Sequence, residues 1–173
     1  MTKANSMATT GKNLSHYDRA TLPNGAHFRV GIVVSEWNEA ITNGLRDGAV
    51  RVLNDAGVTL ENTPILYVPG AFELPLASKW MLEGANPCDA VIAIGAVIRG
   101  ETAHFDYVCQ GVTQGLMQLG LASGKPAVFC VLTDDNIEQS RARSGGEHGN
   151  KGIEAAVACL KMLALKTQQA NPS

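Results

Sequence analysis

A histidine lies between an apolar run and a helical pattern in the stretch Gly95 to Tyr107, GAVIRGETAHFDY. The polar and hinge residues of this stretch are Arg99, Gly100, Glu101, Thr102 and His104. An imidazole beside the free backbone N–H groups of a helix start suits proton transfer near a bound anion. A lone histidine at a helix start is also commonly a cap or a surface group. The buried strand predicted just before His104 is what favours a functional role.

Three further stretches contain residues suited to a polar, planar ligand. Trp37 and Asn38 follow an apolar run, where an exposed indole could stack on a heterocycle or simply pack in the core. In VPGAFELP, glycine permits close backbone approach, and Glu73 could accept bonds from hydroxyl groups or only favour a helix start. The cations that could bind phosphate or be merely solvated are Arg141, Arg143 and Lys151.

Several well-known catalytic and binding motifs are absent from the sequence. Gly124-Lys125 is followed by Pro126 and so is not part of a phosphate-binding P-loop, and no GxGxxG follows the first predicted strand. Cys and His residues have no metal-ligand spacing, and there is no GxSxG turn. Nucleotide, metal and acyl-enzyme chemistry therefore have no support from motifs.

The composition favours one cytoplasmic domain. The 173 residues are 45% hydrophobic, enough for one core, so we expect a single domain over 28–173. Residues 1–27 are rich in Thr, Asn, Ser, Lys and Gly and have almost no apolar periodicity, so we expect a flexible arm there. With a net charge of −2 and scattered cations, no nucleic-acid partner is expected. No apolar run approaches the roughly 20 residues of a membrane span. The four cysteines are far apart and suit reduced core thiols.

Four apolar strands alternate with helical patterns along the chain. The strands are predicted at Phe28–Ser35, Pro64–Val68, Asp89–Ile98 and Ala127–Leu132. Helices are predicted over Asn38–Ala56, from the PGAFELP turn to Leu82, from the histidine stretch to Lys125-Pro126, before Gly145, and from about Asn150, with fraying beyond Lys166. This alternation predicts an α/β fold with a mostly parallel four-stranded sheet between helical layers. Strand order is not readable from the pattern.

The unusual residues of the chain follow the four predicted strands. They are Trp37-Asn38, Gly70 to Glu73, Val97 to His104, and the residues from Thr133 onward. Ligands of parallel sheets bind beyond the carboxyl ends of the strands. The sequence therefore predicts a single site at that edge.

Five segments together resemble the 6,7-dimethyl-8-ribityllumazine synthase family of riboflavin biosynthesis. They are SEWNEAIT (Ser35–Thr42), VPGAFELPLA (Val68–Ala77), GAVIRGETAHFDYV (Gly95–Val108), VLTDDNIEQS (Val131–Ser140) and GNKG (Gly149–Gly152), within a resemblance that covers Phe28 to Leu165. It implies a flavodoxin-like α/β/α sandwich. The implied reaction condenses 5-amino-6-(ribitylamino)uracil with 3,4-dihydroxy-2-butanone 4-phosphate, without cofactor or metal, at sites between the subunits of a pentamer.

The resemblance also implies a role for each site residue. Trp37, with Asn38, takes the place of the family's aromatic over the pyrimidine, which is more often Phe. Ala71, Phe72 and Glu73 would hold the ribityl chain, and Val97 and Ile98 the pyrimidine edge. Glu101 and Thr102 would offer backbone N–H groups to phosphate. His104 matches the proton-transfer histidine, Arg143 the phosphate-binding arginine, and Phe129 and Lys151 the contribution of the adjacent subunit.

The chain departs from the family at Glu147, where bacterial relatives commonly have lysine, so any phosphate contact from that position is lost or replaced. The linker from Arg143 to Lys151 has no insertion that would obstruct packing between pentamers. We therefore expect an icosahedral shell of about 60 subunits. Two alternatives to an enzyme remain open at this point: a non-catalytic flavin or lumazine carrier, and a purely shell-forming protein.

Overall fold

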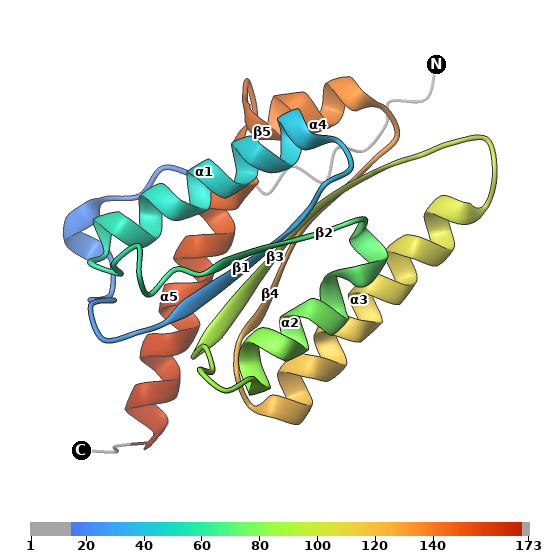
Figure 1. Cartoon of the computed structure of the whole chain (residues 1–173). Coiled ribbons are helices and arrows are strands. Elements are labelled where there is room, and N and C mark those ends of the chain that lie inside the picture. Colours follow the sequence, from blue (N-terminus) through green and yellow to red (C-terminus); the bar gives the residue numbers. More distant parts are fainter. Residues whose placement is uncertain (1–14, 171–173) are drawn as a thin grey trace.

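The computed structural model describes residues 15–170 and is built on a four-stranded sheet. The strands are β1 (Val30–Ser35), β2 (Ile65–Val68), β3 (Ala90–Ile98) and β4 (Ala127–Asp134). They pair in the order β2-β1-β3-β4, and every pairing is parallel (Figure 1). This order, which the sequence left open, is the one found in flavodoxin-like folds.

Helices cover both faces of the sheet. The helices are α1 (Glu39–Asp55), α2 (Leu74–Glu83), α3 (His104–Ser123), α4 (Ile137–Arg143) and α5 (Lys151–Ala170). Figure 1 shows α1 and α5 on one face and α2 and α3 on the other. Alternate residues of β1 supply the two cores, because Ile32 packs with α1 and α5 whereas Val33 packs with α2 and α3. The predicted three-layer sandwich is confirmed.

The element boundaries differ from the sequence pattern in three places. Before α2 the chain forms a short 3₁₀ turn, η2 (Ala71–Glu73), which leaves Pro75 in the first helical turn where a missing N–H is harmless. The expected fraying of the last helix at Lys166 is wrong, since α5 continues to Ala170. The linker after α4 forms a small antiparallel hairpin, β5 (Ser144–Gly146) with β6 (Gly149–Asn150).

The segment before β1 contacts α1 where the structure describes it. Residues 1–14 of the predicted arm lie outside the described residues. Beyond them come η1 (Arg19–Thr21) and two ties to the end of α1. The Tyr17 hydroxyl donates to Asp55 Oδ2 at 2.8 Å, and the Gly25 N–H donates to the Ala56 carbonyl at 2.8 Å.

The cysteines are free thiols placed in or near the core. Cys88, Cys130 and Cys159 are buried and Cys109 is half-buried. Burial raises the pKa of Cys130 and of Cys159 to about 12, so both remain protonated at neutral pH. None of the helices in residues 15–170 combines the length and the apolar character that crossing a bilayer requires.

The crossing of α1 and α5 depends on a glycine. A Cβ added at Gly152, in the first turn of α5, would overlap the backbone carbonyl of Leu45 in α1. Next to this contact, the Asn150 side-chain amide donates to the Gly44 carbonyl at 2.8 Å. The two helices therefore approach through backbone atoms that a side chain cannot displace.

Replacing Gly152 with alanine should destabilise the protein by about 1–3 kcal/mol, because overpacking against backbone forces the helices apart. Gly100→Ala in the exposed turn before α3 is the control, since a Cβ there would meet nothing within 4 Å. That change should be neutral or stabilise by about 0.4–1 kcal/mol. Urea unfolding at one protein concentration measures both. Equal midpoints for the two variants would contradict the close approach.

Candidate active site

A cleft of about 700 Å³ opens at the carboxyl ends of β1 and β3. At this point in the strand order, α1 leaves β1 toward one face and α3 leaves β3 toward the other, so the helices separate. The residues that line the cleft are Trp37, Asn38, Gly70, Ala71, Phe72, Glu73, Ala96, Val97, Ile98, His104, Tyr107 and Val108. Three separate segments of the predicted site thus meet in one place.

Asn38 fixes the wall that carries the indole. Its backbone is left-handed, with φ 61° and ψ 46°, a conformation that asparagine tolerates better than most residues. Its side-chain Nδ2 donates to the Ala96 carbonyl of β3 at 3.0 Å, which ties the end of β1 to the neighbouring strand. Trp37, directly before it, is 73% exposed. The indole is therefore held at the cleft and is free to contact a ligand.

The opposite wall is formed by η2. Phe72 is exposed, yet its ring rests against Gly111 of α3, where an added Cβ would lie 2.9 Å from Phe72 Cε2. The carboxylate of Glu73 lies over Gly70, with Oε2 3.1 Å from the position of a Cβ there. Glycine at these two positions thus leaves room for an aromatic ring and a carboxylate at the mouth of the cleft.

His104 is the first residue of α3 and its side chain is exposed. Its backbone N–H donates to Thr102 Oγ1 at 3.4 Å. No residue in the described part of the chain forms a hydrogen bond with its imidazole ring. The imidazole therefore lines the cleft without a structural partner, next to the N-terminus of a long helix that favours a bound anion.

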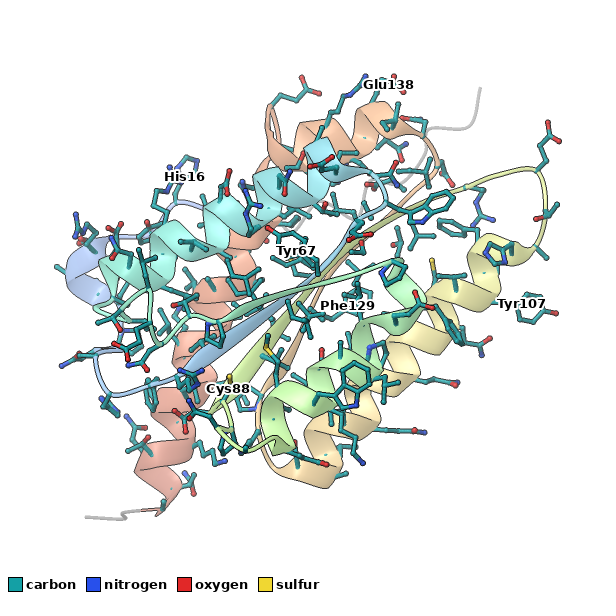
Figure 2. The ribbon with its side chains drawn as sticks, viewed as in Figure 1. His16, Tyr67, Cys88, Tyr107, Phe129 and Glu138 are labelled. Atoms are coloured by element: carbon teal, nitrogen blue, oxygen red, sulfur yellow. The ribbon has the colours of Figure 1, made fainter. Side chains whose placement is uncertain are left out.

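Two of the three candidate cations lie in a second cleft, of about 470 Å³, along β4 and the start of α5, whereas Arg141 lines neither cleft. Arg143 and Lys151 line it together with Phe129, which Figure 2 labels on β4. Arg143 Nη1 donates to the Gln139 carbonyl at 2.9 Å. Lys151 Nζ donates to Glu154 Oε2 at 2.8 Å. This cleft combines an aromatic ring, two cations and two carboxylates, those of Asp134 and Glu154.

The structure divides the predicted site residues into two groups. No residue in 15–170 lines both clefts, so Trp37 and His104 are not joined by Arg143 or Lys151 within one chain. Glu101 and Thr102 line neither cleft and lie in the exposed turn before α3. The expectation of a single site at one edge therefore holds for only part of the set in an isolated chain.

Sequence reasoning missed several residues that line these clefts, among them Tyr107, Val108 and Glu154. Tyr107 and Val108 lie three and four positions after His104, so they share its helix face, and Figure 2 shows Tyr107 projecting outward from α3. Glu154 has the same relation to Lys151. Helical spacing from a predicted site residue was the signal that could have found them.

Metal chemistry has no group of ligands in the part of the chain that the structure describes. Among residues 15–170, no three His, Cys, Asp or Glu side chains lie close enough to hold a metal ion. The groups available are an aromatic wall, a carboxylate, an imidazole and, in the second cleft, two cations. Such a set can stack a ring, bind hydroxyl groups, transfer protons and bind an anion.

Comparison with known proteins agrees with this chemistry. The family model described as 6,7-dimethyl-8-ribityllumazine synthase matches residues 27–167. Proteins of that name are 57% identical in Christiangramia forsetii, over 92% of this chain and 95% of the relative, and 55% identical in Flavobacterium johnsoniae, over 94% and 85%. One from Porphyromonas gingivalis is 51% identical over 92% and 99%. The chain belongs to the 6,7-dimethyl-8-ribityllumazine synthase family.

Proposed function

We propose that this protein condenses 5-amino-6-(ribitylamino)uracil with 3,4-dihydroxy-2-butanone 4-phosphate to form 6,7-dimethyl-8-ribityllumazine in riboflavin biosynthesis, releasing phosphate and water. The observation that carries the proposal is the cleft between β1 and β3, where Trp37, Glu73 and His104 meet in a chain of this family. A planar pyrimidine with a polyhydroxyl chain and a reacting carbonyl fits these three groups. No observation favours a carrier or a purely structural protein.

The pyrimidine substrate is assigned to the walls of the first cleft. Trp37 stacks on the ring, with Asn38 beside it, and Val97 and Ile98 border the ring edge. The ribityl hydroxyl groups are bound by residues 71–73, with the Glu73 carboxylate as the main acceptor. Support comes from the exposure of Trp37 and from the placement of all these residues around one opening.

The phosphate-bearing substrate is assigned to the turn before α3 and to the cations. Backbone N–H groups of Glu101 and Thr102 lie near the helix N-terminus, where an anion is favoured. Arg143 binds the phosphate as a guanidinium fork and stabilises the dianion as it leaves. His104 moves protons as the amine attacks the ketone, water is lost, phosphate is eliminated and the ring closes. Both reactants are intrinsically reactive, so their alignment is the larger contribution.

The two separate clefts support a site shared between copies of the chain. One copy presents Trp37 and His104 but has its cations in another cleft. We propose that Phe129 and Lys151 of a neighbouring copy complete the site, and that Arg143 comes with them because it lines the same cleft as Lys151. A single chain would then hold half of each of two sites.

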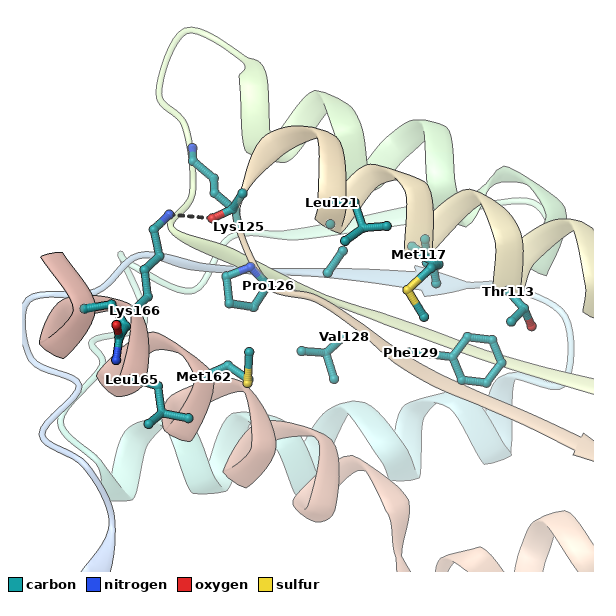
Figure 3. A pocket seen from close by; sticks show the side chains of 15 residues that line it. Thr113, Met117, Leu121, Lys125, Pro126, Val128, Phe129, Met162, Leu165 and Lys166 are labelled. Carbon is teal, nitrogen blue, oxygen red and sulfur yellow. Dashed lines mark hydrogen bonds between the residues drawn. The ribbon is translucent and has the colours of Figure 1, made fainter.

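Two exposed apolar surfaces support a ring of such copies. One runs from η2 along α2, where Phe72, Leu76 and Trp80 are each more than half exposed at four-residue spacing. The other is a groove of about 540 Å³ between α3 and α5, shown in Figure 3 and lined by Met117, Leu121, Phe129, Met162 and Leu165 among others. Contact between two different surfaces is heterologous, and heterologous contacts that close generate rings.

We therefore propose a homopentamer as the active unit, with icosahedral packing of pentamers beyond it. The compact β5–β6 hairpin supports this packing, because Gly145 and Gly149 adopt positive φ and let the linker turn back at once. Glu147, the residue that replaces the lysine common in bacterial relatives, is exposed on this hairpin, with its Oε1 3.6 Å from His148 Nε2. The cytoplasm is proposed as the compartment, since the thiols are free and mostly buried.

The proposed function is tested by mixing the purified protein with both substrates. Lumazine fluorescence should rise well above the spontaneous background, and inorganic phosphate should appear in equal amount. Omitting either substrate is the control. Binding of the pyrimidine without any faster product formation would favour the non-catalytic carrier.

Replacing His104 with alanine should lower kcat by about 10²-fold, the low end for a general acid–base group, because the condensation also proceeds without a base. The KM for the pyrimidine should change little, since the imidazole does not hold the ring. Steady-state kinetics with each substrate varied measures both constants. An unchanged kcat at saturating substrate would remove His104 from the mechanism.

Replacing Arg143 with alanine should chiefly raise the KM for the butanone phosphate, because a guanidinium fork pairs with phosphate in a way that a lysine does not duplicate. Arg141→Ala on the same helix is the control, since Arg141 lines neither cleft. If Arg143→Ala weakens both substrates alike, Arg143 supports the fold and the phosphate subsite lies elsewhere.

Breaking the proposed ring should abolish activity. Leu121→Glu places a charge in the apolar groove and should yield monomers without turnover, as shown by analytical ultracentrifugation and the fluorescence assay. Leu60→Glu changes a leucine of similar exposure outside both apolar surfaces and should leave assembly and activity intact. A monomeric Leu121→Glu protein with full turnover would rule out a shared site. Pentamers that never form larger particles would rule out only the shell.

A further inference from the structure

Arg99 links three separate parts of the chain at the edge of the proposed site. Its Nε donates to Asp135 Oδ1 at 3.1 Å, and its Nη2 lies 3.2 Å from Asp106 Oδ1. The guanidinium also lies over the Phe105 ring, with Cζ 4.1 Å from the centroid. Hydrogen bonds with Asp106 and then Asp135 raise the pKa of Arg99, so the side chain remains charged. These contacts connect the end of β3, the first turn of α3 and the segment that follows β4.

The turn that Arg99 precedes has few other restraints. Residues 99–104 are all exposed, and a Cβ at Gly100 would meet nothing within 4 Å. The only side-chain hydrogen bond within this turn is the 3.4 Å contact from the His104 N–H to Thr102. At its far end, Phe105 is buried and lies under the guanidinium. Arg99 therefore holds both ends of a turn whose own residues hold it only weakly.

The contact with Asp135 extends this connection to α4. The Asp135 N–H donates to Gln139 Oε1 at 2.9 Å, and the Gln139 carbonyl accepts from Arg143 Nη1 at 2.9 Å. Three hydrogen bonds, joined through the covalent frames of Asp135 and Gln139, thus link Arg99 to the proposed phosphate-binding arginine. Arg99 therefore contacts the segment that leads to His104 in the first cleft and is linked, through Asp135 and Gln139, to Arg143 in the second.

We propose that Arg99 is a positioning residue for the phosphate-bearing substrate, acting as a tether that joins the Gly100–Ala103 turn and the start of α3 to Asp135 and α4. The inference rests on the proposed function. The competing explanation is purely electrostatic: Arg99 neutralises two carboxylates that would otherwise repel a phosphate dianion. The two explanations predict opposite effects when Asp135 is removed.

The first kinetic test is Arg99→Gln. The KM for the butanone phosphate should rise roughly 10- to 100-fold, because small displacements of a positioning group have effects of that size. The KM for the pyrimidine should stay near that of the unchanged protein. Arg141→Gln removes the same charge from another exposed ion pair and should have no effect. If both substrates weaken equally, or if Arg141→Gln does the same, the proposal is overturned.

The second kinetic test is Asp135→Ala, which removes one negative charge and one end of the tether. A tether predicts a higher KM for the butanone phosphate, whereas neutralisation predicts a lower one. Arg99→Lys keeps the charge but not the fork, so it should restore only part of the loss if position matters. A lower KM in Asp135→Ala, with full rescue by Arg99→Lys, would leave Arg99 as a counter-charge only.

A third measurement does not depend on the enzyme assignment. The N–H groups of Arg99 and Asp106 form backbone bonds to the carbonyls of Asp134 and Ala103, both at 3.0 Å. Hydrogen exchange at these two amides should be faster in Arg99→Gln than in the unchanged protein and should be unaffected in Arg141→Gln. Unchanged exchange would overturn the tether even in an active enzyme. Faster exchange would support it even if the condensation assay failed.

Discussion

The parallel pairing of β1 with β3 is the constraint on which the cleft depends. It brings Val34 opposite Ile94, so that residues after Ser35 and residues after Gly95 emerge at one edge. The chain reaches β3 only after passing through β2, and the two helices that follow β1 and β3 lie on opposite faces. An opening between them is the geometric result. The bond from Asn38 to the Ala96 carbonyl then holds the two strand ends together beside the opening.

Rigid elements present nearly all the groups assigned to chemistry. Trp37 precedes a helix at the end of a fully buried strand, and Phe72 lies in a short helical turn packed against α3. His104 opens a long helix whose inner face is buried. Groups fixed in this way need little reorganisation when substrates bind, which suits a condensation in which alignment matters more than activation. The exposed turn at residues 99–104 is the exception, and side-chain contacts of Arg99 compensate for its lack of burial.

The distribution of charge is the basis of the proposal that one chain by itself is an incomplete catalyst. The imidazole and the helix N-terminus lie in one cleft, while Arg143 and Lys151 lie in another with Glu154 beside them. A reaction that binds and releases a phosphate dianion needs cations near the reacting groups. The apolar surfaces on α2 and between α3 and α5 offer a physical reason for copies to associate. Assembly and catalysis are therefore parts of one proposal.

Much of the fold and half of the site could be predicted from local pattern. Apolar β-branched runs predicted the strands to within two residues at each end, because a strand buried on both faces is apolar throughout. Helical periodicity predicted α1 and α3, because a helix that buries one face has apolar residues at a regular spacing. The sequence pattern was least informative for short elements that only backbone hydrogen bonds define, such as the β5–β6 hairpin after α4. Tyr107 and Glu154 were missed because they belong to a cleft only through helical neighbours.

The sequence by itself determined the alternation of elements, the residue types available for chemistry and the motifs of the lumazine synthase family. Those properties are local, since each depends on neighbours within a few positions. Only the tertiary structure decided the strand order, the meeting of Trp37 with His104 and the separation of both from Arg143. These depend on which strands pair and on which face each helix packs, and such contacts join residues tens of positions apart that no local pattern specifies.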